Sequence, residues 1–363
     1  MPYPTDYGGA IEQFYKIVSL YKLGIKIHLH CFLNKRPAQN ELYKYCFSVN
    51  YYRRKKASGI SLSIPYIVNS RKCSELIDNL KKDVYPILIE GIHCSYYLNK
   101  GELRDRLVLL RLHNTEFIYY QQLALHEKHP LKKIYFKYES SLLEKYEKKL
   151  CKQVTIAALS EQDVNLYQQQ LETNHIFYLP VFIPFTQAQG IEGNGCYCLY
   201  HGNLSINENE EAVIWLLENV FKGLDLPFVI AGKAPSQRLE FLIKQYEHTC
   251  LVANPDDKEL HDMIAKAQIN ILPSFNNTGV KLKLLNALYN GRHCVVNKAG
   301  VEGTGLNTLC SIAEDADDLK KVIHHLYSVP YTNTENIKRQ EILNRLYCNE
   351  ENAKTIINFF WGN

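Results

Sequence analysis

Short apolar runs alternate with amphipathic stretches along the whole of this 363-residue chain. Helical patterns occupy about 207–220, 237–246 and 256–267 in the second half. The apolar runs between and around them are CYCLYHG (196–202), FVIAG (228–232), TCLVANP (249–255), INILPSF (269–275) and HCVVN (293–297). Near-continuous apolar strands joined by helices are typical of a parallel sheet that is buried on both faces. The second half is therefore predicted to be a doubly wound α/β domain.

The first half shows the same alternation. A helix is predicted at 10–24, a long charged helix at 131–152, and strands at the runs 25–32, 85–93, 106–114 and 154–160. A doubly wound domain ordinarily opens on a strand, whereas this chain opens on the loop PYPTDYGG (2–9). We therefore expect the sheet of the first domain to lack its first strand.

The length of the chain exceeds what one hydrophobic core usually serves, so two domains are expected. The stretch VFIPFTQAQGIEGNG (181–195) is a probable linker, because it is polar and carries glycines between two strand–helix series. We predict one Rossmann-like domain at 1–185 and a second Rossmann-like domain at 196–331. Helices at 332–363 are expected to cross back to the first domain, and the two domains to face one another across a cleft.

Charge and cysteine content bear on where the protein works. Residues 1–190 hold 26 Lys and Arg against 17 Asp and Glu, a net of +9, so the remainder carries −5 of the overall +4. A basic first half favours an anionic surface or a phosphate-bearing acceptor. Eleven dispersed cysteines, no signal-peptide pattern and no run of about 20 apolar residues predict a cytoplasmic protein. Peripheral contact with the inner membrane surface stays open.

Loops at the carboxyl ends of parallel strands are where α/β folds bind ligands. A glycine pair that opens a helix suits close approach to an anion, and polar side chains at strand ends suit ligand contact. Four loops are candidates. They contribute Gly8 and Gly9 from the first loop, Glu90 and His93 from the second, Arg111, His113, Asn114 and Glu116 from the third, and residues of SFNNTGVKLKLLNALYNG (274–291) from the fourth.

The fourth loop runs into a helix that glycine closes. Asn277 or Thr278 can cap that helix, and Gly279 permits close approach. Lys281 and Lys283 stand at its positive end. Lys233 in AGKAP ends another predicted strand and could converge on the same place. We predict that a diphosphate binds at the start of this helix. A capped surface helix with solvated lysines is the alternative interpretation.

Other motifs carry weaker indications. Asp315-x-Asp317 resembles a metal-binding pair, but acidic residues at the start of a helix also fit its dipole, so no metal site is predicted. The stretch YYRRKK (51–56) mixes aromatic and basic residues. Because no recognised nucleic-acid motif accompanies it, we interpret it as a solvated or headgroup-facing patch and predict no nucleic-acid partner.

Six further segments stand in order along the chain: YPTDYGGAIEQFYKIVSLYKLG (3–24), YPILIEGIH (85–93), RLHNTEFIYY (111–120), YHGNLSINENEEAVIWLLENV (200–220), FVIAGKAP (228–235) and GVKLKLLNALYNGRHCVVNKAGVEGTGL (279–306). Together they resemble the GT-B glycosyltransferases of family 4 or group 1 type, and most of all bacterial mannosyltransferases. The resemblance implies a retaining transferase that acts in cell-surface polysaccharide synthesis with no cofactor or obligatory metal. It also implies that the domain at 196–331 binds a nucleotide-sugar donor and that the domain at 1–185 binds a glycan or lipid-linked acceptor.

The resemblance also assigns residues on the first domain. It places Gly8 and Gly9 at the first glycine-rich loop of the family. It places His93 at the pocket histidine that contacts the donor sugar, and His113 with Asn114 at the next strand end.

On the second domain it places Gly202 at the opening glycine. The Arg and Lys that the family sets on the diphosphate fall on Asn203 and Asn209, and its paired glutamates fall on Thr278 and Asn286. Asn286 can still bind ribose hydroxyls. Because Asn203 cannot neutralise phosphate, our hypothesis is that Lys281, Lys283 and Lys233 replace the missing cations.

Three functions stay open on the sequence. The first is the sugar transferase described above. The second is a nucleotide-sugar epimerase of the same fold, with Glu90, Glu116 and Glu302 as its supply of acid and base groups. The third is a catalytically silent relative that acts as a binding partner.

Overall fold

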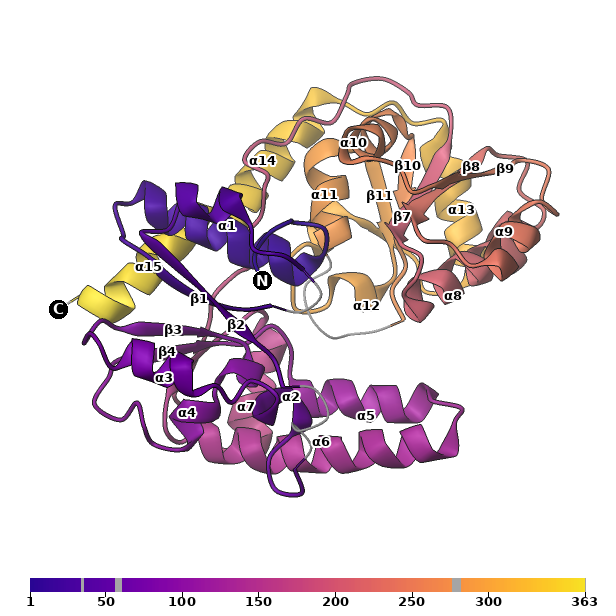
Figure 1. Cartoon of the computed structure of the whole chain (residues 1–363). Coiled ribbons are helices and arrows are strands. Elements are labelled where there is room, and N and C mark those ends of the chain that lie inside the picture. Colours follow the sequence, from indigo (N-terminus) through magenta and orange to yellow (C-terminus); the bar gives the residue numbers. More distant parts are fainter. Residues whose placement is uncertain (34–35, 56–60, 276–281, 363) are drawn as a thin grey trace. The chain divides into compact units, whose positions relative to one another are not determined.

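The computed structural model describes residues 1–33, 36–55, 61–275 and 282–362. The chain divides into two compact units, each with its own parallel sheets (Figure 1). One contains Met1–Pro184 and Tyr347–Asn363, and the other contains Phe185–Asn277 and Lys281–Leu346. Among the described helices, none is long and apolar enough to span a bilayer.

The first unit holds two parallel sheets, β1–β2 and β3–β4–β5–β6. The strands are β1 (His28–Leu33), β2 (Ser48–Arg53), β3 (Ile87–Glu90), β4 (Val108–Arg111), β5 (Thr155–Ala158) and β6 (Ile176–Tyr178). The helices are α1 (Gly8–Lys22), η1 (Asn40–Lys44), α2 (Tyr66–Asn69), α3 (Ser74–Leu80), η3 (Ile92–Cys94), α4 (Tyr96–Asn99), α5 (Glu116–His126), α6 (Pro130–Leu150), α7 (Glu161–Gln170) and α15 (Asn349–Trp361).

Side chains of β4 alternate between two cores, as the period of a strand requires. Val108 and Leu110 pack with Leu143 and Leu150 of α6, whereas Leu109 packs on the other face, with Leu20 of α1. Ala353 and Ile356 of α15 join that second core. Figure 1 shows α15 beside α1, so the last helix of the chain completes the cover of this face.

The second unit is built on one six-stranded parallel sheet of order β12–β11–β10–β7–β8–β9. The strands are β7 (Cys198–Asn203), β8 (Phe228–Lys233), β9 (Thr249–Ala253), β10 (Ile269–Ile271), β11 (His293–Val296) and β12 (Ser311–Ile312). The helices are α8 (Asn207–Leu216), η4 (Leu217–Phe221), α9 (Gln237–Ile243), α10 (Asp257–Lys266), α11 (Leu282–Asn290), α12 (Lys298–Val301), η5 (Asn307–Leu309), α13 (Ala316–Tyr327) and α14 (Asn333–Tyr347).

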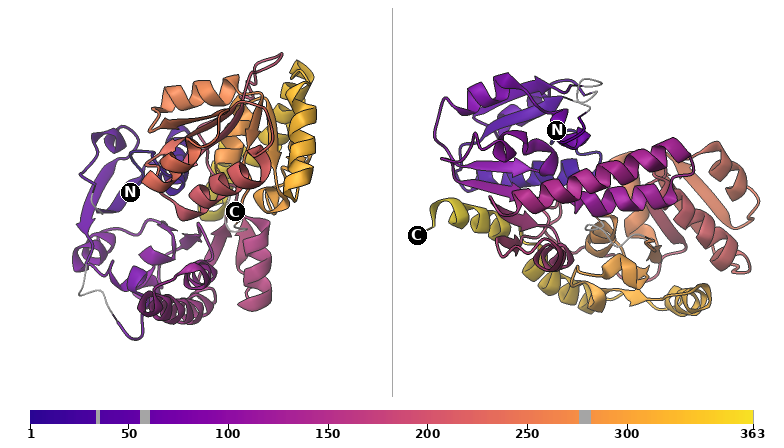
Figure 2. Two further views of the ribbon diagram at one scale, coloured as in Figure 1. Left: turned by 90° about the vertical axis from the view of Figure 1, so that its right-hand side faces the viewer. Right: turned by 90° about the horizontal axis from the view of Figure 1, so that it is seen from below.

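Strand order and helix contacts place helices on both faces of this sheet. The chain winds outward through β7, β8 and β9, then returns to β10 and winds the other way through β11 and β12. Helix α8 packs against α9, and α13 packs against η4, while α10 packs against α11 (Figure 2). The reversal between β7 and β10 is a topological switch point, where α/β sheets bind ligands at the carboxyl ends of the strands.

The acidic run at 314–318 begins a helix, as predicted. Asp315 caps α13 by accepting hydrogen bonds from the backbone N–H groups of Asp317 and Asp318. The interpretation of YYRRKK as a surface patch was wrong for its start, because Tyr51 and Tyr52 lie in β2 and Tyr52 is only 2% exposed. The prediction missed β2 because its aromatic residues were read together with the cations that follow them.

Candidate active site

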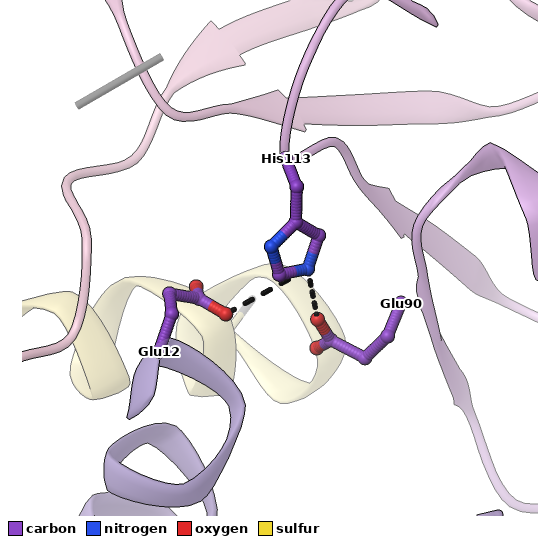
Figure 3. A group of neighbouring side chains, drawn as sticks. All are labelled: Glu12, Glu90 and His113. Carbon is purple, nitrogen blue, oxygen red and sulfur yellow. Dashed lines mark hydrogen bonds and ion pairs between the residues drawn. The ribbon is translucent and has the colours of Figure 1, made fainter. Parts of the chain in front are cut away.

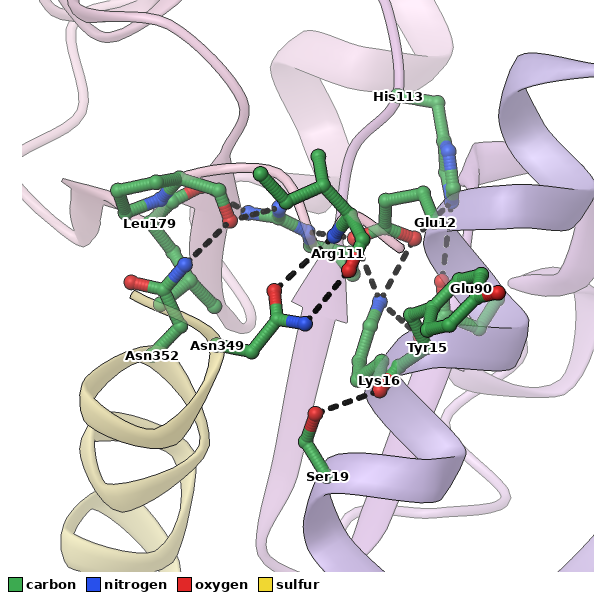
Figure 4. Close-up of polar contacts among 12 residues, drawn as sticks. Glu12, Tyr15, Lys16, Ser19, Glu90, Arg111, His113, Leu179, Asn349 and Asn352 are labelled. Carbon is green, nitrogen blue, oxygen red and sulfur yellow. Dashed lines mark hydrogen bonds and ion pairs between the residues drawn. The ribbon is translucent and has the colours of Figure 1, made fainter. Parts of the chain in front are cut away.

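The last residues of two neighbouring strands bring opposite charges together in the first unit. Glu90 ends β3 and Arg111 ends β4, and the two are partners in the parallel ladder. Helix α1 lies beside them and contributes Glu12 and Lys16, one turn apart (Figure 4). His113 follows β4 by two residues. We call these five residues the charged cluster.

The charged cluster is joined by short contacts. Lys16 Nζ lies 2.7 Å from Glu90 Oε1 and 2.9 Å from Glu12 Oε1. Arg111 Nε donates to Glu12 Oε1 over 3.0 Å, and His113 Nε2 lies 2.9 Å from Glu90 Oε2 (Figure 3). Glu12, Lys16 and Arg111 are at most 2% exposed. Two carboxylates are thus balanced by Lys16 and Arg111, as buried charges require.

Both carboxyl groups of the cluster are held ionised. Burial alone would raise the pKa of Glu12, but Lys16 and Arg111 together hold that pKa below its ordinary value. Burial likewise opposes ionisation of Glu90, and Lys16 with His113 lowers the pKa of that carboxyl far below its usual range. Glu90 is therefore a carboxylate at neutral pH and an acceptor for His113.

Arg111 also anchors the segment that follows β6. Its guanidinium group donates to the carbonyl oxygens of Leu179 over 2.6 Å and Pro180 over 2.9 Å. Asn349 of α15 holds the same segment, because its amide exchanges two hydrogen bonds with the backbone of Ile183 (Figure 4). The charged cluster is thus tied to the C-terminal helix of the chain.

Glu12, Glu90 and His113 also have the chemistry of a metal site, since their ligand atoms lie within 4.8 Å of one another. Lys16, however, contacts both carboxylates directly. The positive charge that a divalent ion would bring is already supplied by Lys16 and Arg111. The arrangement is that of an ion-pair cluster which orients His113.

His93 and Glu116 lie close to the charged cluster, but burial favours the neutral form of each side chain. Burial, with Arg71 and His113 nearby, holds the pKa of His93 well below its ordinary value, so its imidazole is neutral. Burial raises the pKa of Glu116 to about 7, although His113 and Arg71 act in the opposite direction. Glu116 therefore titrates near physiological pH, as a proton-transferring group should.

Backbone geometry positions both residues. Gly91 has a φ of +79°, and a Cβ at that position would lie 2.3 Å from the His93 ring, so only glycine permits this turn. Glu116 is the first residue of α5, whose start is held by the buried Glu147 of α6: the N–H of Phe117 donates to Glu147 Oε1 over 3.1 Å. Asn114 lies between His113 and Thr115, the N-cap residue of α5.

The second unit presents polar residues at the ends of β7 and β8. Asn203 and Lys233 are ladder partners at these ends, and both are exposed. One residue earlier in each strand, Gly202 of β7 is the ladder partner of Gly232 of β8. A Cβ at Gly232 would lie 2.1 Å from the Gly202 carbonyl oxygen, so Gly232 is required by the close approach of two strands.

Lys283, near the start of α11, reaches this edge. Its Nζ donates to Asn209 Oδ1 and to the Tyr200 hydroxyl, each over 3.1 Å, and lies 4.8 Å from the centre of the Tyr200 ring. Asn209 Nδ2 in turn donates to the Asn203 carbonyl oxygen over 2.9 Å. A hydrogen-bonded path thus connects Lys283 to the end of β7.

The remaining predicted residues are placed as follows. Gly8 and Gly9 form the first turn of α1, after the N-cap residue Tyr7. Asn286 accepts a hydrogen bond from Asn290 over 2.7 Å. Thr278, Gly279 and Lys281 lie outside the residues that the structure describes.

Sequence reasoning missed Glu12, Lys16, Glu147 and Gly232. Glu12 and Lys16 are spaced as an i, i+4 ion pair on a predicted amphipathic helix, which was a usable signal. Nothing in the sequence indicated that Glu147 would hold the start of α5, since it is one acidic residue among several on α6. Gly232 stands in the quoted segment FVIAGKAP, but the closeness of two strands is a tertiary fact.

Known proteins share this architecture. Residues 195–328 match the family described as Glycosyl transferases group 1. A glycosyltransferase of Rickettsia africae has a similar structure, with a TM-score of 0.66 and 12% identity over 97% of this chain and 94% of that one. TarM of S. aureus has a TM-score of 0.58 at 15% identity over 78% of this chain, which spans 57% of TarM. Arabidopsis thaliana UGT89C1, solved with UDP-L-rhamnose, has a TM-score of 0.58 at 11% identity over 96% of both chains.

The parallel sheets, the switch point and these structural neighbours define the GT-B fold. A curated relative in Klebsiella pneumoniae, described as an uncharacterized 44.6 kDa protein in the cps region, is 30% identical over 327 residues, 84% of this chain and 83% of that protein. The chain belongs to the same family as this relative, and its residues 195–328 match the group 1 glycosyltransferases.

Proposed function

We propose that the protein transfers a sugar from a nucleotide-sugar donor to a glycan or lipid-linked acceptor in capsule polysaccharide synthesis, with retention of anomeric configuration. The relative in a cps region supports the polysaccharide setting. Neighbours solved with UDP or UDP-L-rhamnose support a nucleotide-sugar donor. Mannose is the first sugar to test, because the sequence resembles mannosyltransferases.

The contact between Lys283 and Asn209 carries the proposal. Asn209 stands where the resembling family sets a cation on the donor diphosphate. The ammonium group of Lys283 lies 3.1 Å from the amide oxygen of Asn209, so α11 brings a positive charge to that position. A cation there stabilises negative charge as it builds on the departing diphosphate. Lys233, exposed at the end of β8, is a second cation on the same edge.

The first unit supplies the acceptor side in this proposal. His113, oriented by Glu90, and Glu116, with a pKa of about 7, are the groups suited to hold and deprotonate an acceptor hydroxyl. Glu90 is engaged by Lys16 and His113 and is therefore poorly suited to serve as the free acid or base that an epimerase would need. The acceptor hydroxyl attacks the face that the diphosphate leaves, and no protein nucleophile takes part.

Nucleotide binding tests the proposal first. Melting temperature is measured for the full chain against UDP, GDP, ADP, TDP and CMP. The proteins are the natural sequence, Lys283→Met and the control Lys258→Met, which changes an exposed lysine of α10. A ligand at 100 times its Kd stabilises the folded state by about 2.7 kcal/mol. We expect one nucleotide to shift the natural protein and the control but not Lys283→Met.

Turnover of the matching nucleotide-sugar then separates the two functions that remain. Release of the nucleoside diphosphate in the presence of acceptor supports the transferase. Binding of a nucleotide without turnover across varied acceptors would favour a silent relative. A nucleotide response that Lys283→Met leaves intact would show that the donor diphosphate is held elsewhere.

A further inference from the structure

The first half of α6 carries an apolar stripe that faces outward. Leu131, Ile134, Tyr135 and Tyr138 follow the i, i+3, i+4, i+7 spacing of one helix face. Such a face is ordinarily buried, yet Leu131 is 72% exposed and Ile134 is 64% exposed. An exposed apolar stripe of this kind marks an interaction surface.

The stripe is not needed to hold α6 in place. A different face of the helix, with Leu143, Tyr146 and Leu150, is buried against the core of the first unit. Helix α5 lies alongside α6, and Figures 1 and 2 show the two as a hairpin.

Two more leucines, on or beside the α5–α6 hairpin, are also exposed. Leu125, near the end of α5, is 64% exposed, and Leu62 is 84% exposed. The Tyr138 hydroxyl donates to the Leu62 carbonyl oxygen over 2.8 Å, which places Leu62 beside α6. We call Leu62, Leu125 and the four residues of the stripe the hairpin surface.

Positive charge surrounds the hairpin surface. Lys128, Lys132, Lys133 and Lys137 are interspersed with its apolar residues, and 128–138 contains no acidic residue. In the described part of the chain, none of these four lysines forms an ion pair. Alternating lysine and large apolar side chains are typical of helices that lie in the interface of an anionic bilayer.

We propose that the hairpin surface docks the protein on a membrane that contains anionic lipid. The leucine and isoleucine side chains enter the headgroup boundary, the tyrosine rings lie at that boundary, and the lysines meet the lipid phosphates. A second copy of this chain fits this surface poorly, because it would set four lysines against four lysines. The inference bears on a lipid-linked acceptor, but it does not rest on catalysis, since docking is measured without donor or acceptor.

Vesicle flotation with the full chain tests the inference. Vesicles of phosphatidylcholine alone are compared with vesicles that also contain phosphatidylglycerol. The variants are Leu131→Gln with Ile134→Gln, and Lys132→Gln with Lys137→Gln. The control is Ile337→Gln with Lys338→Gln on α14, where Ile337 is 56% exposed. Melting temperature is measured for each to confirm that the exposed changes leave the fold intact.

We expect binding to phosphatidylglycerol vesicles only, and weaker binding at high salt. Each lysine near an anionic surface contributes about a fivefold gain, so the lysine pair should lower partitioning about twenty-five-fold. The Leu131 and Ile134 changes should lower it by more than about tenfold, and the control should bind as the natural protein does. Equal binding to both vesicle types, or undiminished binding of either variant, would overturn the inference. So would a dimer in solution that the Leu131 and Ile134 changes convert to monomers, since the surface would then join two copies.

Discussion

The two carboxylate oxygens of Glu90 have different partners: Oε2 lies 2.9 Å from His113 Nε2, and Oε1 lies 2.7 Å from Lys16 Nζ. Lys16 thereby sets the direction of the carboxylate that orients the imidazole. Lys16 also contacts the buried Glu12, which holds Arg111. The orientation of a candidate catalytic histidine thus depends on a lysine that points inward from α1.

Replacing Lys16 should be costly. Lys16→Met leaves two carboxylates with Arg111 as their only permanent cation, and breaking a buried ion pair costs roughly 3–5 kcal/mol. We expect urea unfolding to show a loss of that order. Lys22→Met, at the exposed end of the same helix, is the matched control and should unfold with the natural midpoint. A similar midpoint for both variants would show that Lys16 does not stabilise the cluster.

Glu116 should make stability depend on pH. Its pKa rises from 4.5 to about 7 on folding, so the native state binds more protons than the unfolded state between these values. Stability from this group is therefore lost as pH rises from about 4.5 to about 7. Glu116→Gln removes the effect, and above pH 7 the variant should be more stable by about 3 kcal/mol. Urea unfolding at a series of pH values measures the difference.

The control for this pH series is Glu144→Gln on the exposed side of α6. Its stability should run parallel to that of the natural protein throughout. If the gain from Glu116→Gln were the same at pH 4 and pH 8, the carboxyl would not be buried as described.

A lysine on α8 should be able to replace the lysine that α11 places near Asn209. Lys283→Asn should weaken nucleotide binding about tenfold or more, because a charge-assisted contact to phosphate is lost. Adding Asn209→Lys on α8 should restore much of the affinity, since the two side chains meet at 3.1 Å. Calorimetric titration with the nucleotide that shifts the melting temperature measures both. A double variant no tighter than the single one would argue against a shared site.

Gly202 and Gly232, which are ladder partners, should differ in how well they tolerate replacement by alanine. A Cβ at Gly232 would lie 2.1 Å from a backbone oxygen, whereas a Cβ at Gly202 would meet only the Asn209 side chain, at 3.6 Å. Gly232→Ala should destabilise the fold by roughly 1–3 kcal/mol through overpacking, and Gly202→Ala much less. Thermal unfolding of the two variants gives the comparison, and equal losses would contradict the strand spacing.

Local sequence patterns determined much of the architecture. The apolar runs located most of the strands, and the amphipathic stretches located the main helices, because periodicity depends only on which faces of each element are buried. Strand-end positions also placed His93 and His113 after β3 and β4 in the first unit and Lys233 at the end of β8 in the second, since the parallel strands of one sheet end at the same edge. The cap at Asp315 was equally local.

Only the tertiary structure decided which charges meet. Glu12 contacts Arg111 from 99 residues away, and Lys16 contacts Glu90 from 74 residues away, and no periodicity specifies such pairs. It also decided that Leu143 of α6 is buried while Leu131 of the same helix faces outward. Both leucines have the same local propensity, and only the packing of the other elements determines which one is covered.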